Sequence, residues 1–153
     1  MTDLDSFDLA ILRILQRDNA TPQREIGEQV HLSAPSVQRR IRRMEATGVI
    51  EANVARVSPE AVGLALTVIV QIELLSETPA DIDAAKRTFR DAPEVQQCHY
   101  VTGEADFVLV LQVASMAAYE DFTRRTLFAS GNVKKFRTMV SMDSVKTGTA
   151  LGF

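Results

Sequence analysis

A change in the spacing of apolar residues is the feature of this chain that most constrains its fold. From Leu4 to Ile50 apolar side chains recur every three or four positions, as in helices that pack through one face. Between Leu64 and Leu74 they alternate, as in a strand with one buried face, formed by Leu66, Val68, Val70, Ile72 and Leu74. A length of 153 residues allows one domain or two small ones, and the change of period favours two.

The boundary between the two expected domains lies just after Ile50. The segment IEANVARVS is polar on alternate residues and ends before Pro59, which suits a linking strand, and it has too little glycine and proline for a loose tether. We therefore expect a first domain over residues 1–50, a linking strand or hinge over 51–63 and a second domain over 64–153.

The spacing predicts three helices in the first domain. The first covers Leu4–Leu15, the second begins near Thr21 as its N-cap, and the third begins at Ser33 as its N-cap. His31 and Leu32 join the second helix to the third through a tight turn. This is the outline of a helix-turn-helix, whose second helix enters the major groove of DNA.

The third helix of this set is strongly basic. Residues 1–57 hold eight Lys/Arg and eight Asp/Glu, yet four arginines fall within the five residues 39–43. Val37, Ile41 and Met44 share the packing face, so the charge lies elsewhere on the helix. Arginine forks suit guanine edges and phosphates, and glutamine pairs with adenine. The expected DNA-binding residues are Ser33, Pro35, Ser36, Gln38, Arg39, Arg40, Arg42 and Arg43.

Within this set we expect different roles. The residues nearest the start of the helix, Ser36, Gln38 and Arg39, suit base contacts, whereas Arg42 and Arg43 suit phosphates and Arg40 lies toward the side. The alternative is an ordinary solvated helix face, on which the arginines pair with acids of the same domain: Glu25, Glu28 or Glu45.

The second domain alternates strands with helices. After the strand at 64–74 we expect a helix that contains Ile82, Ala85 and Phe89, strands at Val95–Val101 and Phe107–Val113, a helix at Met116–Phe128 and a last strand at Val133–Asp143. The order βαββαβ is that of ferredoxin-like domains. The predicted fold class is α+β: an all-α, winged-helix-like helix-turn-helix domain, a linking strand and a ferredoxin-like βαββαβ domain.

Both predicted helices of a ferredoxin-like domain cover the same face of its sheet. The other face carries apolar residues, among them Ile69, Val108, Val110 and Met139, and an exposed apolar patch of that kind marks an interface. We expect a homodimer through this face. A two-fold dimer would also present two basic helices to DNA about one turn, or about 34 Å, apart.

Several classes of protein find little support in the sequence. Cys98 is the only cysteine, so a disulfide framework or a thiolate metal cluster is not expected, and we expect no metal or cofactor. His31 and His99 lack a convergent acid, base or nucleophile, so we do not expect an enzyme. The acidic N-terminus and the lack of a long apolar run predict a cytoplasmic protein without membrane contact.

The chain resembles the Lrp/AsnC, or feast/famine, family of transcriptional regulators. The N-terminal resemblance lies in FDLAILRILQRD followed by LSAPSVQRRIRRMEATGVI, and the C-terminal one in VQQCHYVTGEADFVLVLQVASMAAYEDF. The resemblance implies a sequence-specific regulator that binds double-stranded DNA. It also implies a second domain that senses a small effector, commonly an amino acid, and dimers that assemble into tetramers or octamers.

In proteins similar to this one the effector lies between dimers, at a glycine-containing strand turn, the start of the second sensor helix and a neighbour's last strand. Carried over to matching positions, the resemblance implies an effector site formed by Tyr100, Val101, Thr102, Gly103, Glu104, Asp106, Met116, Tyr119, Phe128, Thr138, Met139 and Val140. Gly103 would let backbone N–H groups approach a carboxylate, and Glu104 or Asp106 would receive the ammonium group. Without the resemblance, Gly103 is a hairpin turn and the apolar members of the set are packing residues.

This chain departs from the family pattern in the turn between the DNA-binding helices and in the effector region. His31 stands where many relatives have glycine, and histidine tolerates the positive φ of such a turn. Met139 and Ser141 replace the aromatic or β-branched residues of leucine-responsive members, which speaks against leucine, and Ala105 alters the pocket volume. The alternative function is an effector-binding protein, or an enzyme of related architecture, with a vestigial DNA-binding half.

Overall fold

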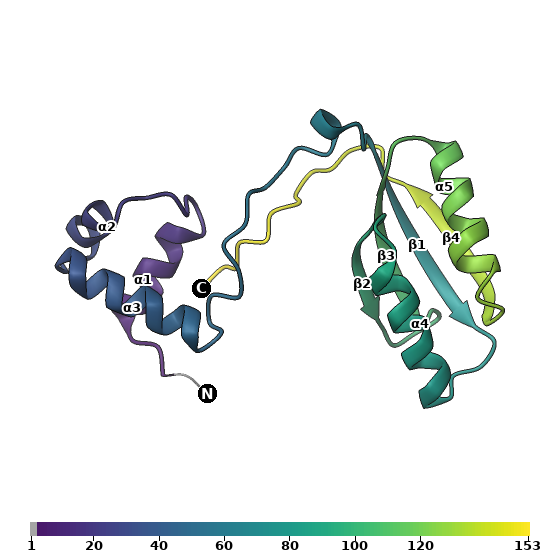
Figure 1. Ribbon diagram of the computed structural model, residues 1–153, viewed down its shortest axis with the longest axis horizontal. Helices are drawn as coiled ribbons and strands as arrows, with labels where there is room; N and C mark the ends of the chain where they lie inside the picture. The colour runs from purple at the N-terminus through teal and green to yellow at the C-terminus, as the bar shows by residue number, and fades with distance from the viewer. Residues whose placement is uncertain (1–2) are drawn as a thin grey trace. The chain divides into compact units, whose positions relative to one another are not determined.

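The computed structural model describes residues 3–153, which form two compact units (Figure 1). The first unit comprises the N-terminal residues up to Arg56 together with Lys146–Phe153. The second unit comprises Val57–Val145. Each unit has its own cluster of buried apolar side chains.

The first unit is built from three helices: α1 (Ser6–Leu15), α2 (Gln23–Val30) and α3 (Ala34–Ala46). Each helix contributes apolar side chains at helical spacing to one small core, which consists of Ile11, Ile26, Val30, Val37 and Met44. The described residues of this unit contain no strand, so helices alone form its core.

The caps of the helices follow local side-chain chemistry. Ser33 accepts a hydrogen bond from the Ser36 backbone N–H, so it is the N-cap of α3 as predicted. The expectation that Thr21 caps α2 is wrong, because its hydroxyl donates to the Asp18 carbonyl at 2.7 Å and Pro22 takes the cap position. Asp5 caps α1 in a reciprocal capping box with Asp8.

The turn between α2 and α3 depends on one left-handed residue and one close approach. His31 adopts φ 58° and ψ 41°, so the predicted positive φ is confirmed. The Leu32 backbone N–H donates to the Gly27 carbonyl at 2.9 Å. A Cβ at Gly27 would lie 2.4 Å from the Leu32 carbonyl oxygen, so only glycine fits there without a backbone shift.

The connection that follows α3 differs from our expectation. Residues 51–58 belong to no helix or strand in the structure, and the short 3-10 turn η1 (Glu60–Val62) leads into the sheet. A strand is defined by hydrogen bonds to a neighbouring strand, and within the described chain no segment lies in register with this one. The predicted linking strand is therefore an extended segment without a partner.

The second unit follows the predicted βαββαβ order. Its strands are β1 (Leu66–Leu74), β2 (Val95–Tyr100), β3 (Phe107–Val113) and β4 (Val133–Val140), and its α-helices are α4 (Pro79–Asp91) and α5 (Met116–Phe122). All strand pairs are antiparallel, in the order β2-β3-β1-β4.

Among the element ends that differ from the prediction, two differ by three residues or more. The last strand stops at Val140 rather than Asp143, where its pairing with β1 runs out. The predicted helix Met116–Phe128 changes at Thr123 into one π-helical stretch, η2 (Thr123–Phe128), which keeps Thr123, Thr126 and Leu127 buried. A wider turn lets these three side chains face the core together.

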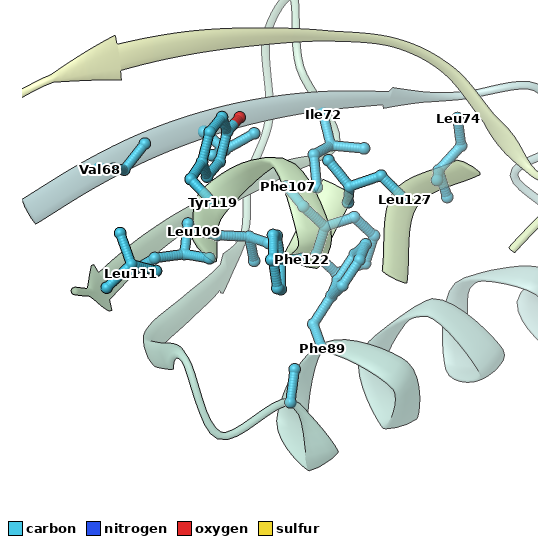
Figure 2. Close-up of a cluster of buried hydrophobic side chains, with 13 residues drawn as sticks. Val68, Ile72, Leu74, Phe89, Phe107, Leu109, Leu111, Tyr119, Phe122 and Leu127 are labelled. Carbon is cyan, nitrogen blue, oxygen red and sulfur yellow. The ribbon is translucent and has the colours of Figure 1, made fainter. Parts of the chain in front are cut away.

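The two faces of the sheet are unequally covered. Side chains from α4 and α5 pack onto β1 and β3, as Phe89, Tyr119 and Phe122 do in Figure 2. On the opposite face Ile69 lies in register with Val110 on one side and Met139 on the other. These three side chains form an apolar row across three strands, and neither helix of the unit packs on them.

The segment at the C-terminal end returns to the first unit. The Arg13 guanidinium donates to the Phe153 carbonyl at 2.7 Å and lies 5.6 Å from the centre of its ring. Gln16 accepts a hydrogen bond from the Leu151 backbone N–H at 2.7 Å. These contacts fix the segment along α1. No helix among residues 3–153 has the length and apolar character needed to span a bilayer.

Candidate DNA-binding and effector-binding sites

The side chains of α3 divide by direction around the helix. Val37 and Met44 are fully buried against α1 and α2, and Ile41 is half-buried beside them. At 100° per residue, Arg39 points almost opposite this core, and Arg42 lies about 50° to one side of that direction; both are exposed. Arg43 lies about 50° to the other side, so its contacts and not its angle set it apart from Arg42.

The other two arginines lean toward α1 and pair with a buried acid. Asp8 has a fully buried side chain, and its Oδ1 accepts from the Arg40 guanidinium at 2.8 Å. Arg43 pairs with the other oxygen, Oδ2, of the same carboxylate. Arg40 also reaches Asp5 at 2.8 Å and lies 5.4 Å from the centre of the Phe7 ring.

Two members of this cluster have shifted pKa values. The pKa of Arg40 is raised by its hydrogen bonds, first to Asp8 and then to Asp5. The pKa of Asp5 is lowered, chiefly by the Asp8 backbone N–H and next by Arg40. The Arg40 guanidinium therefore lies beside two carboxylates, on the flank of α3 that faces α1.

The remaining expected DNA-binding residues lie at the start of α3. Pro35 is exposed in the first turn, Gln38 is half-buried, and the Ser36 hydroxyl accepts a hydrogen bond from Ser33 at 3.0 Å. The acids of the alternative interpretation have other partners or none: Glu28 pairs with Arg24, and Glu45 accepts from Asn53. Within residues 3–153, no acid forms an ion pair with Arg39 or Arg42.

Sequence reasoning missed Asp8, although a signal was present. Asp8 follows Leu4 by four residues and precedes Ile11 by three, which places a carboxylate on the apolar face of the first helix. A buried charge requires a partner of opposite charge, and the arginine run provides four cations within the same domain. Because the partners are 32 and 35 residues away, local spacing did not identify them.

The turn of the expected effector site is held firmly to the sheet. Gly103 adopts φ 126°, which glycine favours. The Asp106 carboxylate accepts from the Leu74 backbone N–H at 2.7 Å, and the Asp106 N–H donates to the Ile72 carbonyl at 2.8 Å. Asp106 thus has a structural role, whereas Glu104 is exposed and is the carboxylate better placed to meet a ligand.

The expected effector residues outside the turn have mixed surroundings. Tyr119 is only 6% exposed, and its hydroxyl is hydrogen-bonded to Thr138. Burial raises the pKa of Tyr119, against the opposing effect of Thr138. Met116 is about half exposed, and Phe128, 66% exposed, packs edge-on against Phe136.

These residues do not converge within one copy of the chain. The turn precedes β3 and Met116 follows it, so the two lie at opposite ends of a seven-residue strand, about 20 Å apart. Met139 points to the open face of the sheet, whereas Thr138 and Val140 point to the helical side. The structure brings Tyr119 to Thr138 and leaves the rest of the set spread along the sheet.

The second unit has two hollows near these residues. One, of about 400 Å³, lies between α4 and β2 and includes Tyr100, whose ring is 5.1 Å from the Lys86 ammonium. The other, of about 40 Å³, lies beside Glu104 and Ala105 on the open face and includes Lys135 and Arg137. The smaller hollow has room for about one water molecule, so the turn alone does not enclose an amino acid.

Two residues that suggest other chemistry, Cys98 and His99, are neighbours on β2. His99 is exposed on β2, 3.3 Å from Gln97, and burial raises the pKa of the neighbouring Cys98 thiol. Among residues 3–153, no group of three or more His, Cys, Asp or Glu side chains is arranged to hold a metal ion.

The fold and the basic helix define a class of protein: a DNA-binding regulator with a separate α+β ligand-binding domain. Comparison with protein-family models agrees. Residues 4–45 match the AsnC-type helix-turn-helix domain, and residues 67–151 match the Lrp/AsnC ligand-binding domain. The chain belongs to the Lrp/AsnC family of transcriptional regulators.

Individual relatives match along almost the whole chain. An uncharacterised HTH-type transcriptional regulator, y4tD, from Sinorhizobium fredii is 42% identical over 149 residues, which cover 97% of this chain and 88% of that protein. The crystal structure of an AsnC family regulator from Agrobacterium tumefaciens is similar with a TM-score of 0.92 at 31% identity, covering 97% of both chains.

A third relative was solved with a ligand. The structure of a transcriptional regulator from Neisseria meningitidis in complex with L-Met is similar with a TM-score of 0.91 at 28% identity. It covers 98% of this chain and 97% of that one. The chain is therefore an HTH-type transcriptional regulator with a domain of the kind that senses effectors.

Proposed function

We propose that this regulator reads a specific double-stranded DNA site with α3 and senses an amino acid through its second unit, as a homodimer that assembles further into tetramers or octamers. The observation that carries the DNA part is the exposure of Arg39 and Arg42, which point away from the core of the helix-turn-helix. No acid in the described chain neutralises them, so they are available to phosphates and base edges.

The start of α3 supplies the remaining contacts. The recognition helix of a helix-turn-helix contacts bases through its N-terminal residues, which here are Ser33, Pro35, Ser36 and Gln38. We assign base contacts to Ser36, Gln38 and Arg39, and phosphate contact to Arg42. A bidentate arginine contact is worth about 1–3 kcal/mol of discrimination against the wrong base.

Selection from a random duplex library tests the DNA part without knowledge of the target site. Wild-type protein is expected to enrich one sequence within a few rounds. Arg39→Ala is expected to relax the preference at defined base positions, whereas Arg42→Ala weakens binding to all sequences alike. A wild-type pool that shows no enrichment would refute sequence-specific binding, and Arg17→Ala, at an exposed position outside α3, is the matched control.

For the effector we propose a zwitterionic amino acid bound between subunits. A relative binds L-Met, and the candidate residues of this chain lie too far apart for one copy to surround a ligand. The turn at 100–106 of one subunit and the residues around α5 and β4 of another would then complete one site. Glu104 would receive the ammonium group, because Asp106 is already bonded to the Leu74 backbone N–H.

A thermal-shift screen of the proteinogenic amino acids tests the effector part. Binding to the folded assembly raises the melting temperature, by an amount that corresponds to about 2.7 kcal/mol at a ligand concentration of 100 Kd. Glu104→Gln is expected to abolish the shift, and Glu77→Gln, an exposed position outside the set, should retain it. A panel without any response would contradict the proposal.

The dimer is proposed from the open face of the sheet. The row formed by Val110, Ile69 and Met139 lies outside the core and is apolar across three strands. Burial of such a row against a second copy removes it from water, and the two-fold operation repeats the same contacts on both sides.

A further inference from the structure

We infer that Asp8 is a positioning residue of the DNA-binding surface: it holds Arg40 and Arg43 on the α1 side of α3, so that only Arg39 and Arg42 of the arginine run contact DNA. This inference rests on the proposed role of α3 as the DNA-reading helix. It divides four arginines that look equivalent in the sequence into two pairs with different functions.

Both oxygens of the buried Asp8 carboxylate are bonded to arginine side chains. The Asp8 side chain is 1% exposed, and each of its oxygens has a different arginine partner, Oδ1 with Arg40 and Oδ2 with Arg43. Oδ2 also accepts from the Asp5 backbone N–H at 3.1 Å, within the capping box of α1. The carboxylate is thus fixed to α1, and the two guanidinium groups are fixed to the carboxylate.

Arg40 is surrounded by two carboxylates and an aromatic ring. Its guanidinium meets Asp8 and Asp5, each at 2.8 Å, and lies over the Phe7 ring. Only 20% of its side chain is exposed. A guanidinium held by two carboxylates and a ring is not available to a phosphate, because it would have to give up contacts of equal charge.

The cluster of two acids and two arginines has no net formal charge. Asp5, Asp8, Arg40 and Arg43 sum to zero, so this flank of α3 offers DNA no net charge, although Arg43 remains 45% exposed. Arg39 and Arg42 lie outside this cluster, without a paired acid in the described residues. The positive charge that α3 presents to DNA therefore comes from Arg39 and Arg42.

The salt dependence of binding to DNA separates the two pairs. Each phosphate contact contributes about 0.9 to the slope of log Kobs against log salt. Full-length protein is titrated with a fluorescent duplex of mixed sequence, about 30 bp long, at KCl concentrations from about 50 to about 300 mM. On this mixed-sequence duplex Arg39 has no cognate base and meets phosphates, as Arg42 does. Arg39→Ala and Arg42→Ala are therefore each expected to make the slope shallower by about 0.9 per subunit, and Arg40→Ala and Arg43→Ala to leave it unchanged.

Asp8→Asn gives the opposite and more distinctive result. The change leaves a side chain of the same shape but releases two arginines, whose long side chains can then turn toward DNA. The slope is expected to become steeper by up to about 1.8 per subunit, and binding to mixed-sequence DNA to become tighter. A residue that merely stabilised the domain would weaken binding instead. Asp3→Asn removes an exposed negative charge from the same end of the chain and should leave the slope unchanged.

The outcomes distinguish this inference from the proposed function. Equal losses of slope for Arg40→Ala and Arg42→Ala, or a wild-type slope for folded Asp8→Asn, would overturn the role of Asp8 and leave α3 as the reading helix. If none of the four arginine variants changes the slope, the proposed function itself fails. Far-ultraviolet circular dichroism establishes that each variant is folded, and should Asp8→Asn not fold, the comparison of the two arginine pairs decides.

Discussion

At the scale of single residues, the turn that leads into α3 depends on two backbone positions of different strictness. His31 holds a left-handed conformation that histidine tolerates, so the turn forms without a glycine at this position. Gly27 has no such freedom, because the Leu32 carbonyl oxygen occupies the space of its missing Cβ. The strict position thus lies inside α2, where a glycine is otherwise unfavourable.

Gly27→Ala is therefore expected to destabilise the first unit by about 2 kcal/mol, within the usual range for added volume in a packed site. Thermal unfolding followed by circular dichroism measures the effect. Gly148→Ala is the matched control, since a Cβ there meets open space. Equal melting temperatures for wild type and Gly27→Ala would show that the turn can move aside.

Asp5 links the stability of the first unit to pH. Its pKa is lowered, first by the Asp8 backbone N–H and then by Arg40. A carboxyl with a lowered pKa in the folded state contributes stability above its unfolded pKa, about 4, and loses it as the pH falls through the folded pKa. Asparagine caps a helix equally well, so Asp5→Asn removes the charge and keeps the cap.

The difference in melting temperature between wild type and Asp5→Asn is expected to be largest near neutral pH and to close below about pH 4. Melting curves between about pH 2 and pH 7 provide the measurement. A gap that is constant, or that widens toward acid, would contradict the assignment of this carboxylate.

At the scale of elements, α5 is attached to β4 by one side-chain hydrogen bond in an otherwise apolar contact. The bond joins the Tyr119 hydroxyl to the Thr138 hydroxyl of β4 (Figure 2 shows the tyrosine). Tyr119→Phe and Thr138→Val are each expected to cost about 1 kcal/mol, and the double variant to cost less than their sum. Chemical denaturation checks this, and strictly additive losses would mean that the two groups act independently.

The helices and strands of this fold could be predicted closely from the sequence. The contacts between residues far apart in the chain could not. Alternation placed β3 to the residue and β1 to within two residues, because their buried faces are apolar at every second position. The π-helical end of α5 and the unpaired segment at 51–58 were missed, since both depend on neighbours rather than on local spacing. For the same reason the arginines were recognised as a group, but their division by Asp8 needed the structure.

At the scale of the whole molecule, the open face of the sheet is expected to hold two copies together. Ile69 is at the centre of the apolar row and pairs with Val110 and Met139. Ile69→Lys is therefore expected to give monomers in sedimentation velocity, while Thr88→Lys on the outer side of α4 keeps the wild-type mass. An unchanged mass for folded Ile69→Lys would place the dimer contact elsewhere.

Two copies of α3 are expected to read DNA from one dimer, and a footprint on the selected duplex tests this arrangement. Guanine-N7 methylation interference and hydroxyl-radical protection are expected to show two major-groove segments on one face of the duplex, about one helical turn, or 34 Å, apart. Arg39→Ala should weaken interference at both segments. A single protected segment, or interference confined to the minor groove, would contradict the account.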